Sequence, residues 1–145
     1  MKLQPDVVAK ILRGEHEQFG YANPSITVAE WRIIKARAFD IHGLPRSTPP
    51  WTLAEAEGFS VQRPKTGFRR ASVTYGKMIR VCPRSDPKEE ALEGHHERVH
   101  CWANKLDMDH DEPDAWIGTM VWTADCLSSL PRWWVDLVAE VSWMY

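Results

Sequence analysis

One short string in this sequence has residue types that can do metal chemistry: His96-Glu97-Arg98-Val99-His100. Residues four apart in a helix lie on the same face, so the two histidines can offer two imidazole nitrogens to one zinc ion. Glu97 can take a proton from a water on that ion, because the metal lowers the pKa of the water to about 7. A peptide carbonyl polarised by the same zinc would be the natural target. The string therefore predicts a zinc-dependent peptidase with Glu97 as general base.

The same string also fits an ordinary core helix. In that interpretation His96 and His100 donate hydrogen bonds to main-chain carbonyls, while His95 and Glu97 face solvent. The chain would then be a structural or adaptor subunit of a larger assembly, with a histidine-rich helix or a vestigial metal site. Both hypotheses stay open on the sequence alone.

The string lies inside the clearest helix of the sequence, over residues 86–106. Asp86 is a natural N-cap, Pro87 suits the first helical position, and Glu89 and Glu90 place negative charge in the first turn. Spacings of three and four residues give this helix one apolar face, which directs His96 inward and sets His100 beside it. The residues of that face are Leu92, His96, Val99, Ala103 and Leu106.

A β-hairpin is predicted just before this helix, in the segment ASVTYGKMIRVC over residues 71–82. Residues that favour strands flank Gly76 and Lys77, a pair that suits a two-residue turn. The segment 51–67 fits either a short helix or a turn followed by a strand, and residues 44–51 form a proline-rich linker.

Helices are expected at both ends of the chain. One covers residues 5–13, and a second begins at a Thr27 N-cap with Glu30 completing a capping box and ends near Gly43. After the acidic stretch 107–114, residues 115–130 predict a buried helix, and residues 131–145 predict a last amphipathic one.

The length and composition indicate one folded domain, and the predicted elements place it in the α+β class, mainly helical, with a small antiparallel hairpin before the metal-site helix. The 145 residues, 43% hydrophobic and 26% charged, are typical of a single globular domain. We expect an N-terminal helical region (1–50), a β-hairpin region (51–84), and a metal-site helix with C-terminal helices (85–145). No long apolar run or signal-like N-terminus is found, and the three cysteines are widely spaced, so we expect a soluble cytoplasmic protein with no membrane partner.

Charge is unevenly distributed along the chain. Residues 1–84 hold 14 Lys and Arg against 7 Asp and Glu, whereas residues 85–145 hold 4 against 13. The two halves can neutralise each other across the fold. The alternative is that the basic half contacts nucleic acid, because several cations flank Phe68 in a pattern that suits phosphate contacts beside a stacking ring. These cations are Arg63, Lys65, Arg69 and Arg70.

Six of the eight tryptophans lie in the C-terminal part of the sequence, at spacings typical of helices that pack in a core. These are Trp102, Trp116, Trp122, Trp133, Trp134 and Trp143. The adjacent pair Trp133 and Trp134 could instead be exposed and dock a protein partner, because exposed tryptophan clusters mark interfaces.

The segment HERVHCW followed by DHDEPDAW resembles the small zincin metallopeptidases, most closely the SprT-like and WLM-type proteases. The resemblance covers residues 70–125 and implies a zincin-like fold that cleaves protein or peptide substrates. It implies that His96, His100 and His110 bind zinc and that Glu97 is the general base. In this family a hairpin or edge strand before the helix holds the substrate in an extended form, and SprT-like proteases often act beside DNA.

The third ligand is where the sequence departs from the family pattern. Asp111 stands where SprT-like proteins often have a glycine after the third histidine. Small gluzincin-like peptidases, which the segment EPDAWIGTMVW also resembles, take a carboxylate from the following helix, and Asp114 is the substitute this implies. Helix capping is an equally simple role for Asp114. The third ligand therefore stays open between His110, Asp114 and the more distant Asp125.

Overall fold

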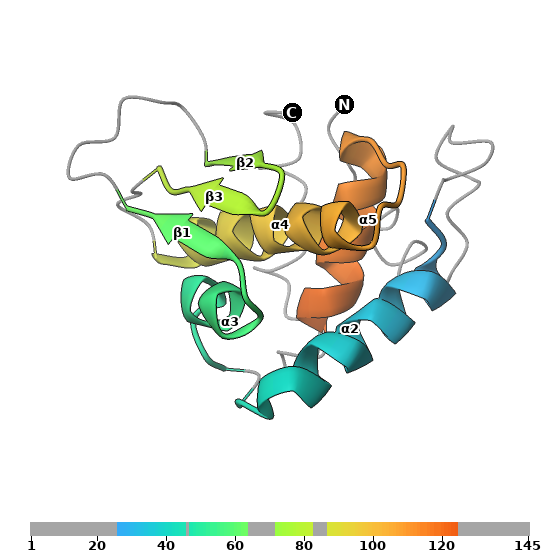
Figure 1. The fold of residues 1–145 in the computed structure, drawn as a ribbon, viewed down its shortest axis with the longest axis horizontal. Coiled ribbons are helices and arrows are strands. Elements are labelled where there is room, and N and C mark those ends of the chain that lie inside the picture. The colour runs from blue at the N-terminus through green and yellow to red at the C-terminus, as the bar shows by residue number, and fades with distance from the viewer. Residues whose placement is uncertain (1–25, 46, 64–71, 83–86, 125–145) are drawn as a thin grey trace.

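A computed structural model describes residues 26–45, 47–63, 72–82 and 87–124 of the chain (Figure 1). Within these residues the fold is α+β and mainly helical. Helix α4 contacts α3, α5 and strands β2 and β3, so the helix with the histidine string lies at the centre of the fold. The elements are α2 (Val28–His42), α3 (Pro50–Ala56), β1 (Ser60–Gln62), β2 (Val73–Tyr75), β3 (Met78–Arg80), α4 (Pro87–Lys105) and α5 (Glu112–Ala124).

Several predictions concern residues outside those described. They are the helices over 5–13 and 131–145, the N-cap at Asp86, and the side chains of Lys65, Phe68, Arg69, Arg70, Asp125, Trp133, Trp134 and Trp143. Of the predicted basic patch, only Arg63 is described, and it is exposed with its guanidinium 5.9 Å from the centre of the Trp51 ring. No helix in the described segments combines the length and apolar character needed to cross a membrane.

Helix α2 begins and ends where the sequence predicted. The Thr27 side chain accepts a hydrogen bond from the Glu30 main-chain N–H, and the Glu30 carboxylate accepts one from the Thr27 N–H, which completes the capping box. The helix ends at Gly43, whose N–H bonds to the Phe39 carbonyl at 2.8 Å. The buried residues Trp31, Ile34 and Ala38 form the face that packs into the core.

The segment that the sequence left open contains both a helix and a strand. Helix α3 begins at Pro50, whose fixed φ suits the first helical position, and strand β1 follows it. The region 51–84 thus contains α3 as well as the sheet. Helix α3 lies against α4 at Gly94, where an added Cβ would be 2.5 Å from Pro50 Cγ and 3.2 Å from Trp51 Cε2. Only glycine allows the two helices to approach so closely.

Among the described residues, three strands form the sheet, in the order β1-β3-β2. Strands β2 and β3 pair antiparallel, with Tyr75 opposite Met78, and Gly76 and Lys77 form the turn between them. Strand β1 pairs with β3 in parallel, a contact that the sequence did not predict. Strand β2 is therefore an edge of the sheet, and it lies over α4 (Figure 1).

Helix α4 is buried around much of its circumference. Residues 92–99 are all buried, including the charged residues Glu93, Glu97 and Arg98 and the imidazoles of His95 and His96. The helix ends at Lys105 because Asp107 adopts a left-handed conformation (φ 54°), and the Met108 N–H closes the end on the Ala103 carbonyl at 2.9 Å. The expectation of a one-sided helix, with His95 and Glu97 facing solvent in the core-helix interpretation, is wrong.

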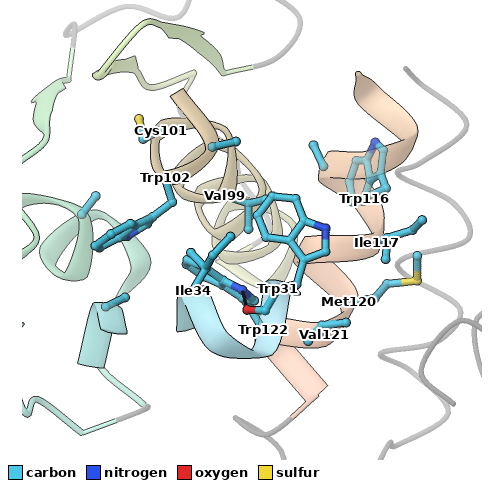
Figure 2. Close-up of a cluster of buried hydrophobic side chains, with 14 of the residues drawn as sticks. Trp31, Ile34, Val99, Cys101, Trp102, Trp116, Ile117, Met120, Val121 and Trp122 are labelled. Carbon is cyan, nitrogen blue, oxygen red and sulfur yellow. Dashed lines mark hydrogen bonds between the residues drawn. The ribbon is translucent and has the colours of Figure 1, made fainter. Parts of the chain in front are cut away.

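The tryptophans within the described residues form the core, as predicted. Figure 2 shows Trp31 of α2 and Trp122 of α5 side by side, with the Trp122 indole N–H donating to the Trp31 carbonyl at 2.9 Å. Their rings meet edge to face at 6.2 Å. Gly118 of α5 lies under Trp31, and an added Cβ there would come within 2.7 Å of the indole and 2.8 Å of Val99 Cγ1.

A buried ion pair joins α4 to the end of α3. Arg98 donates two hydrogen bonds of 2.6 Å to the two oxygens of Glu57, and both residues are almost fully buried. The same carboxylate accepts from the Trp102 indole at 2.8 Å and from His42 Nε2 at 2.9 Å. The Leu44 N–H donates to His42 Nδ1, so the ring proton is on Nε2 and points at Glu57. The carboxylate is thus fully satisfied, as a buried charge must be.

We predict that Glu57→Gln lowers the free energy of unfolding by about 3–5 kcal/mol, because it leaves the Arg98 charge buried without a counter-charge. Urea denaturation followed by circular dichroism measures this change. The control is Glu55→Gln, which changes an exposed glutamate of α3 two residues before Glu57. It should lower the free energy of unfolding by less than about 0.5 kcal/mol. Equal stability of the two variants would contradict the role given to the pair.

We predict that Gly118→Ala lowers stability by about 1–3 kcal/mol through overpacking against Trp31, although alanine is normally the better helix former. The control is the reverse change at exposed Ala36 of α2, where Ala36→Gly should cost about 1 kcal/mol from helix propensity alone. Alanine should thus be preferred at position 36 and glycine at position 118. A stabilised Gly118→Ala variant would show that α5 can move away from Trp31.

Candidate metal centre

The imidazoles of His96 and His100 lie one helical turn apart on α4 and present their ε nitrogens to the same point. The two Nε2 atoms are 3.2 Å apart, and the rings are nearly perpendicular, with centroids separated by 4.7 Å. His96 is fully buried, and His100 is partly exposed. The adjacency predicted from the spacing of four residues is confirmed.

The third group at this point is the carboxylate of Glu112, the first residue of α5. Glu112 Oε2 lies 2.9 Å from His96 Nε2, and Oε1 lies 2.8 Å from His100 Nε2. Among the described residues, His96, His100 and Glu112 are the set whose donor atoms could hold one metal ion, with all of these atoms within 4.8 Å of one another. Glu112 was not among the candidates that the sequence suggested.

The cap at the start of α5 explains why Glu112 lies beside the two imidazoles. Asp111 and Asp114 cap α5 reciprocally: the Asp114 N–H donates to Asp111 Oδ1 at 3.0 Å, and the Asp111 N–H donates to Asp114 Oδ2 at 3.2 Å. These two hydrogen bonds start α5 at Glu112, and the Glu112 carboxylate is directed at α4. Asp114 therefore has the capping role that the sequence also allowed, and among the described residues it is not part of the set that could hold a metal ion.

The His96 ring is oriented by a hydroxyl group of α5. Thr119 Oγ1 donates to the Ala115 carbonyl at 2.7 Å, so it can only accept from His96 Nδ1, which lies 3.0 Å away. This fixes the proton of neutral His96 on Nδ1 and leaves the Nε2 lone pair facing Glu112 and His100. Trp116 stacks on the same ring at 4.0 Å, with 21° between the planes, and holds its orientation.

The His100 ring is oriented by His110, the residue that the sequence proposed as third ligand. His110 Nδ1 donates to the Met108 carbonyl at 3.0 Å, which leaves His110 Nε2 to accept from His100 Nδ1 at 2.9 Å. The structure thus places His110 behind His100, on the ring nitrogen that faces away from Glu112. Such partners of a ligating histidine fix its tautomer and orientation. The remaining candidate, Asp125, lies outside the described residues.

The electrostatics of the three groups differ with their surroundings. Burial lowers the pKa of His96 to about 4, against a smaller opposing effect of Glu112, so this imidazole is neutral at pH 7. Burial also acts to lower the pKa of His100, but the hydrogen bond and charge of Glu112 outweigh it and raise that pKa. Burial alone would raise the pKa of Glu112, yet the adjacent His100 and His96 imidazoles bring it well below its usual range. The carboxylate is therefore ionised.

Glu97 projects from α4 toward the hairpin. Its side chain is buried, and burial raises its pKa to about 7, against the opposing influences of the His100 charge and the Thr74 hydrogen bond. The Thr74 hydroxyl of β2 donates to Glu97 Oε2. A carboxylate with a pKa close to neutral is suited to accept a proton and to release it again.

The distances suit a small tetrahedral cation. Zinc bonds of about 2.0–2.1 Å at a tetrahedral angle place neighbouring donor atoms about 3.3 Å apart. The three separations among His96 Nε2, His100 Nε2 and the Glu112 oxygens are 2.8 to 3.2 Å, so an opening of a few tenths of an ångström would admit the ion. Two imidazoles and a carboxylate are one of the ligand sets of catalytic zinc, which keeps its fourth position open.

No protein-family model, no curated protein and no solved structure matches this chain. The chemistry of the centre is therefore inferred from its own geometry.

We predict that Glu112→Gln loses tight zinc binding, because it removes the charged third ligand. Asp114→Asn is the matched control on the same helical turn, and it should keep zinc because Asp114 caps α5 and is not one of the three candidate ligands. Removal of both imidazoles in His96→Ala/His100→Ala should abolish binding. Elemental mass spectrometry measures the zinc content of each purified variant. Competition with a chelator measures its zinc affinity.

The His110→Ala variant separates the two possible roles of that residue. As a partner of His100, its loss should weaken zinc affinity by about 10- to 100-fold without abolishing binding. If His110→Ala lost the metal entirely while Glu112→Gln kept it, the ligand set would be the one proposed from the sequence.

Proposed function

We propose that this chain is a zinc-dependent metallopeptidase in which His96, His100 and Glu112 hold the ion and Glu97 is the general base. The observation that supports it is the convergence of two imidazole lone pairs and a carboxylate on one point. Both δ nitrogens are already used as donors, to Thr119 and to His110, so the ε nitrogens of both rings face Glu112 and are the atoms available to a cation. Such an arrangement of electron-pair donors calls for a cation at its centre.

Zinc at this point would supply a Lewis acid that polarises a peptide carbonyl and lowers the pKa of a water. The residues of the chain would do the rest of the chemistry. Glu97 lies on the same helix and close enough for the charges of His100 and Glu112 to affect its pKa. Its carboxylate would take the proton of the attacking water and pass it to the leaving amine.

An extended substrate would pair with strand β2. This strand is the edge of the sheet nearest to Glu97, and a sheet edge offers main-chain N–H and C=O groups to an added strand. The resemblance to zincins assigns the same task to the hairpin before the active-site helix. The sheet order, the central helix and the three-residue metal centre together support a zincin-like fold as part of this proposal.

A non-catalytic role is the alternative, in which the same three residues bind an ion, or only each other, to hold α5 on α4. The contacts of Glu112 with both imidazoles would give such a structural link. This alternative gives no task to Glu97, whose carboxylate is buried beside the centre without being one of its ligands. The role of Glu97 therefore distinguishes the two functions.

We predict that Glu97→Gln keeps zinc but lowers kcat/KM for peptide hydrolysis by about 10²- to 10⁴-fold, because it removes the base and spares the ligands. A fluorogenic peptide library or an unfolded protein serves as substrate, and zinc content is measured in parallel. Glu90→Gln, two helical turns earlier on α4, is the control and should keep both activity and zinc. Loss of zinc in Glu97→Gln would mean that Glu97 is a ligand.

A further inference from the structure

Strand β2 is held in register along one face of α4. The Ser72 N–H donates to Glu93 Oε1 at 3.0 Å, and the Asn104 side chain donates to the Gly76 carbonyl at 2.7 Å. Between these two contacts, Thr74 Oγ1 lies 3.2 Å from the Glu97 carbonyl. Two strand residues advance about 6.6 Å and four helical residues about 6 Å, so residues 72 and 74 fall opposite residues 93 and 97. The position of Thr74 over Glu97 is therefore fixed from both sides.

The Thr74 hydroxyl contacts one particular oxygen of Glu97. It donates to Oε2, while Oε1 makes no hydrogen bond within the part of the chain that the structure describes. Oε1 is therefore the oxygen that remains free to take a proton. Without the hydroxyl, the buried carboxylate would lose its hydrogen-bond donor and could rotate about its last bond.

The main chain of Thr74 faces the side of β2 on which the described residues place no further strand. Tyr75 and Met78 flank the two-residue turn, so they form the pair that exchanges hydrogen bonds at the end of the hairpin. Because the bonding direction alternates along an antiparallel strand, the N–H and C=O of Thr74 point away from β3. A peptide added to this edge would pair with the residue whose side chain contacts Glu97.

We propose that Thr74 is a positioning residue, which fixes Glu97 Oε2 so that Oε1 accepts the proton and which joins the docking strand and the base in one unit. This inference rests on the proposed peptidase function for its catalytic consequence. The contact between Thr74 and Glu97 itself can be tested without hydrolysis, so the two proposals can fail separately.

The kinetic test compares Thr74→Val, which keeps the shape and the strand preference of the side chain, with Thr74→Ser, which keeps the hydroxyl. We expect Thr74→Val to lower kcat by about 10- to 100-fold with KM unchanged within about twofold, because the base is misplaced while the strand edge is intact. Thr74→Ser should recover kcat to within a few-fold of the wild type, and all three proteins should hold the same amount of zinc. Equal kcat in Thr74→Val and the wild type, or an equal loss in both variants, would overturn the proposal.

The second readout is the carboxyl carbon resonance of Glu97 in zinc-loaded protein labelled with ¹³C at the side-chain carboxyl of glutamate. Its assignment comes from the signal that disappears in Glu97→Gln. The resonance should shift in Thr74→Val and stay near its wild-type position in Thr74→Ser. An unchanged resonance in Thr74→Val would overturn the contact. A wild type that cleaves nothing while the resonance behaves as expected would overturn the peptidase function and leave the positioning of Glu97 by Thr74 in place.

Discussion

The buried pair of Arg98 and Glu57 is the interaction on which the arrangement of this molecule depends. Arg98 belongs to the same helical turn as the histidine string, and it projects from α4 toward the end of α3. A guanidinium in the core is tolerated only where a carboxylate meets it in a fixed geometry. Glu57 also accepts from Trp102 and His42, so this one carboxylate holds α2, α3 and α4 at a common point. The rotation of α4 about its own axis is thereby set.

That rotation decides what each face of α4 presents. With Arg98 directed at Glu57, the neighbouring Glu97 faces the hairpin, and His96 and His100 face the first turn of α5. Helix α5 then makes two contacts with the histidines. Glu112 meets both imidazoles, and Thr119, two turns later, orients the buried His96 ring. Arg98 and Val99, between the two histidines, are thus structural, although they lie within the string that suggests chemistry.

Helix spacing, helix caps and turn residues allowed much of this arrangement to be predicted. The spacing of four residues placed His96 beside His100, the Thr27 and Glu30 capping box located α2, and Gly76 located the turn of the hairpin. These predictions depend only on residues close together in the sequence. The burial of the Arg98 charge was not predicted, because its partner Glu57 lies 41 residues away in the sequence.

The third group of the candidate metal centre was not predicted, for a similar reason. His110, Glu112 and Asp114 all follow His100 by about a dozen residues, and the choice among them depends on the direction in which the chain leaves α4. That direction is set by the left-handed conformation of Asp107 and by the cap that starts α5. A usable signal was present, because a capping pair at Asp111 and Asp114 is recognisable from its spacing. In the structure this pair makes Glu112 the first residue of α5, where its carboxylate meets both imidazoles of α4.

Gly94 has a consequence for the evolution of this fold. It lies two residues before His96 and belongs to no part of the candidate centre, yet a single methyl group there would collide with Pro50 and displace α3. Displacing α3 would separate Glu57 from Arg98 and alter the rotation of the helix that carries the centre. Under the proposed function, selection on catalysis would act on this position through shape alone. Descendants and relatives that keep this architecture are expected to retain glycine there even where their surrounding residues diverge.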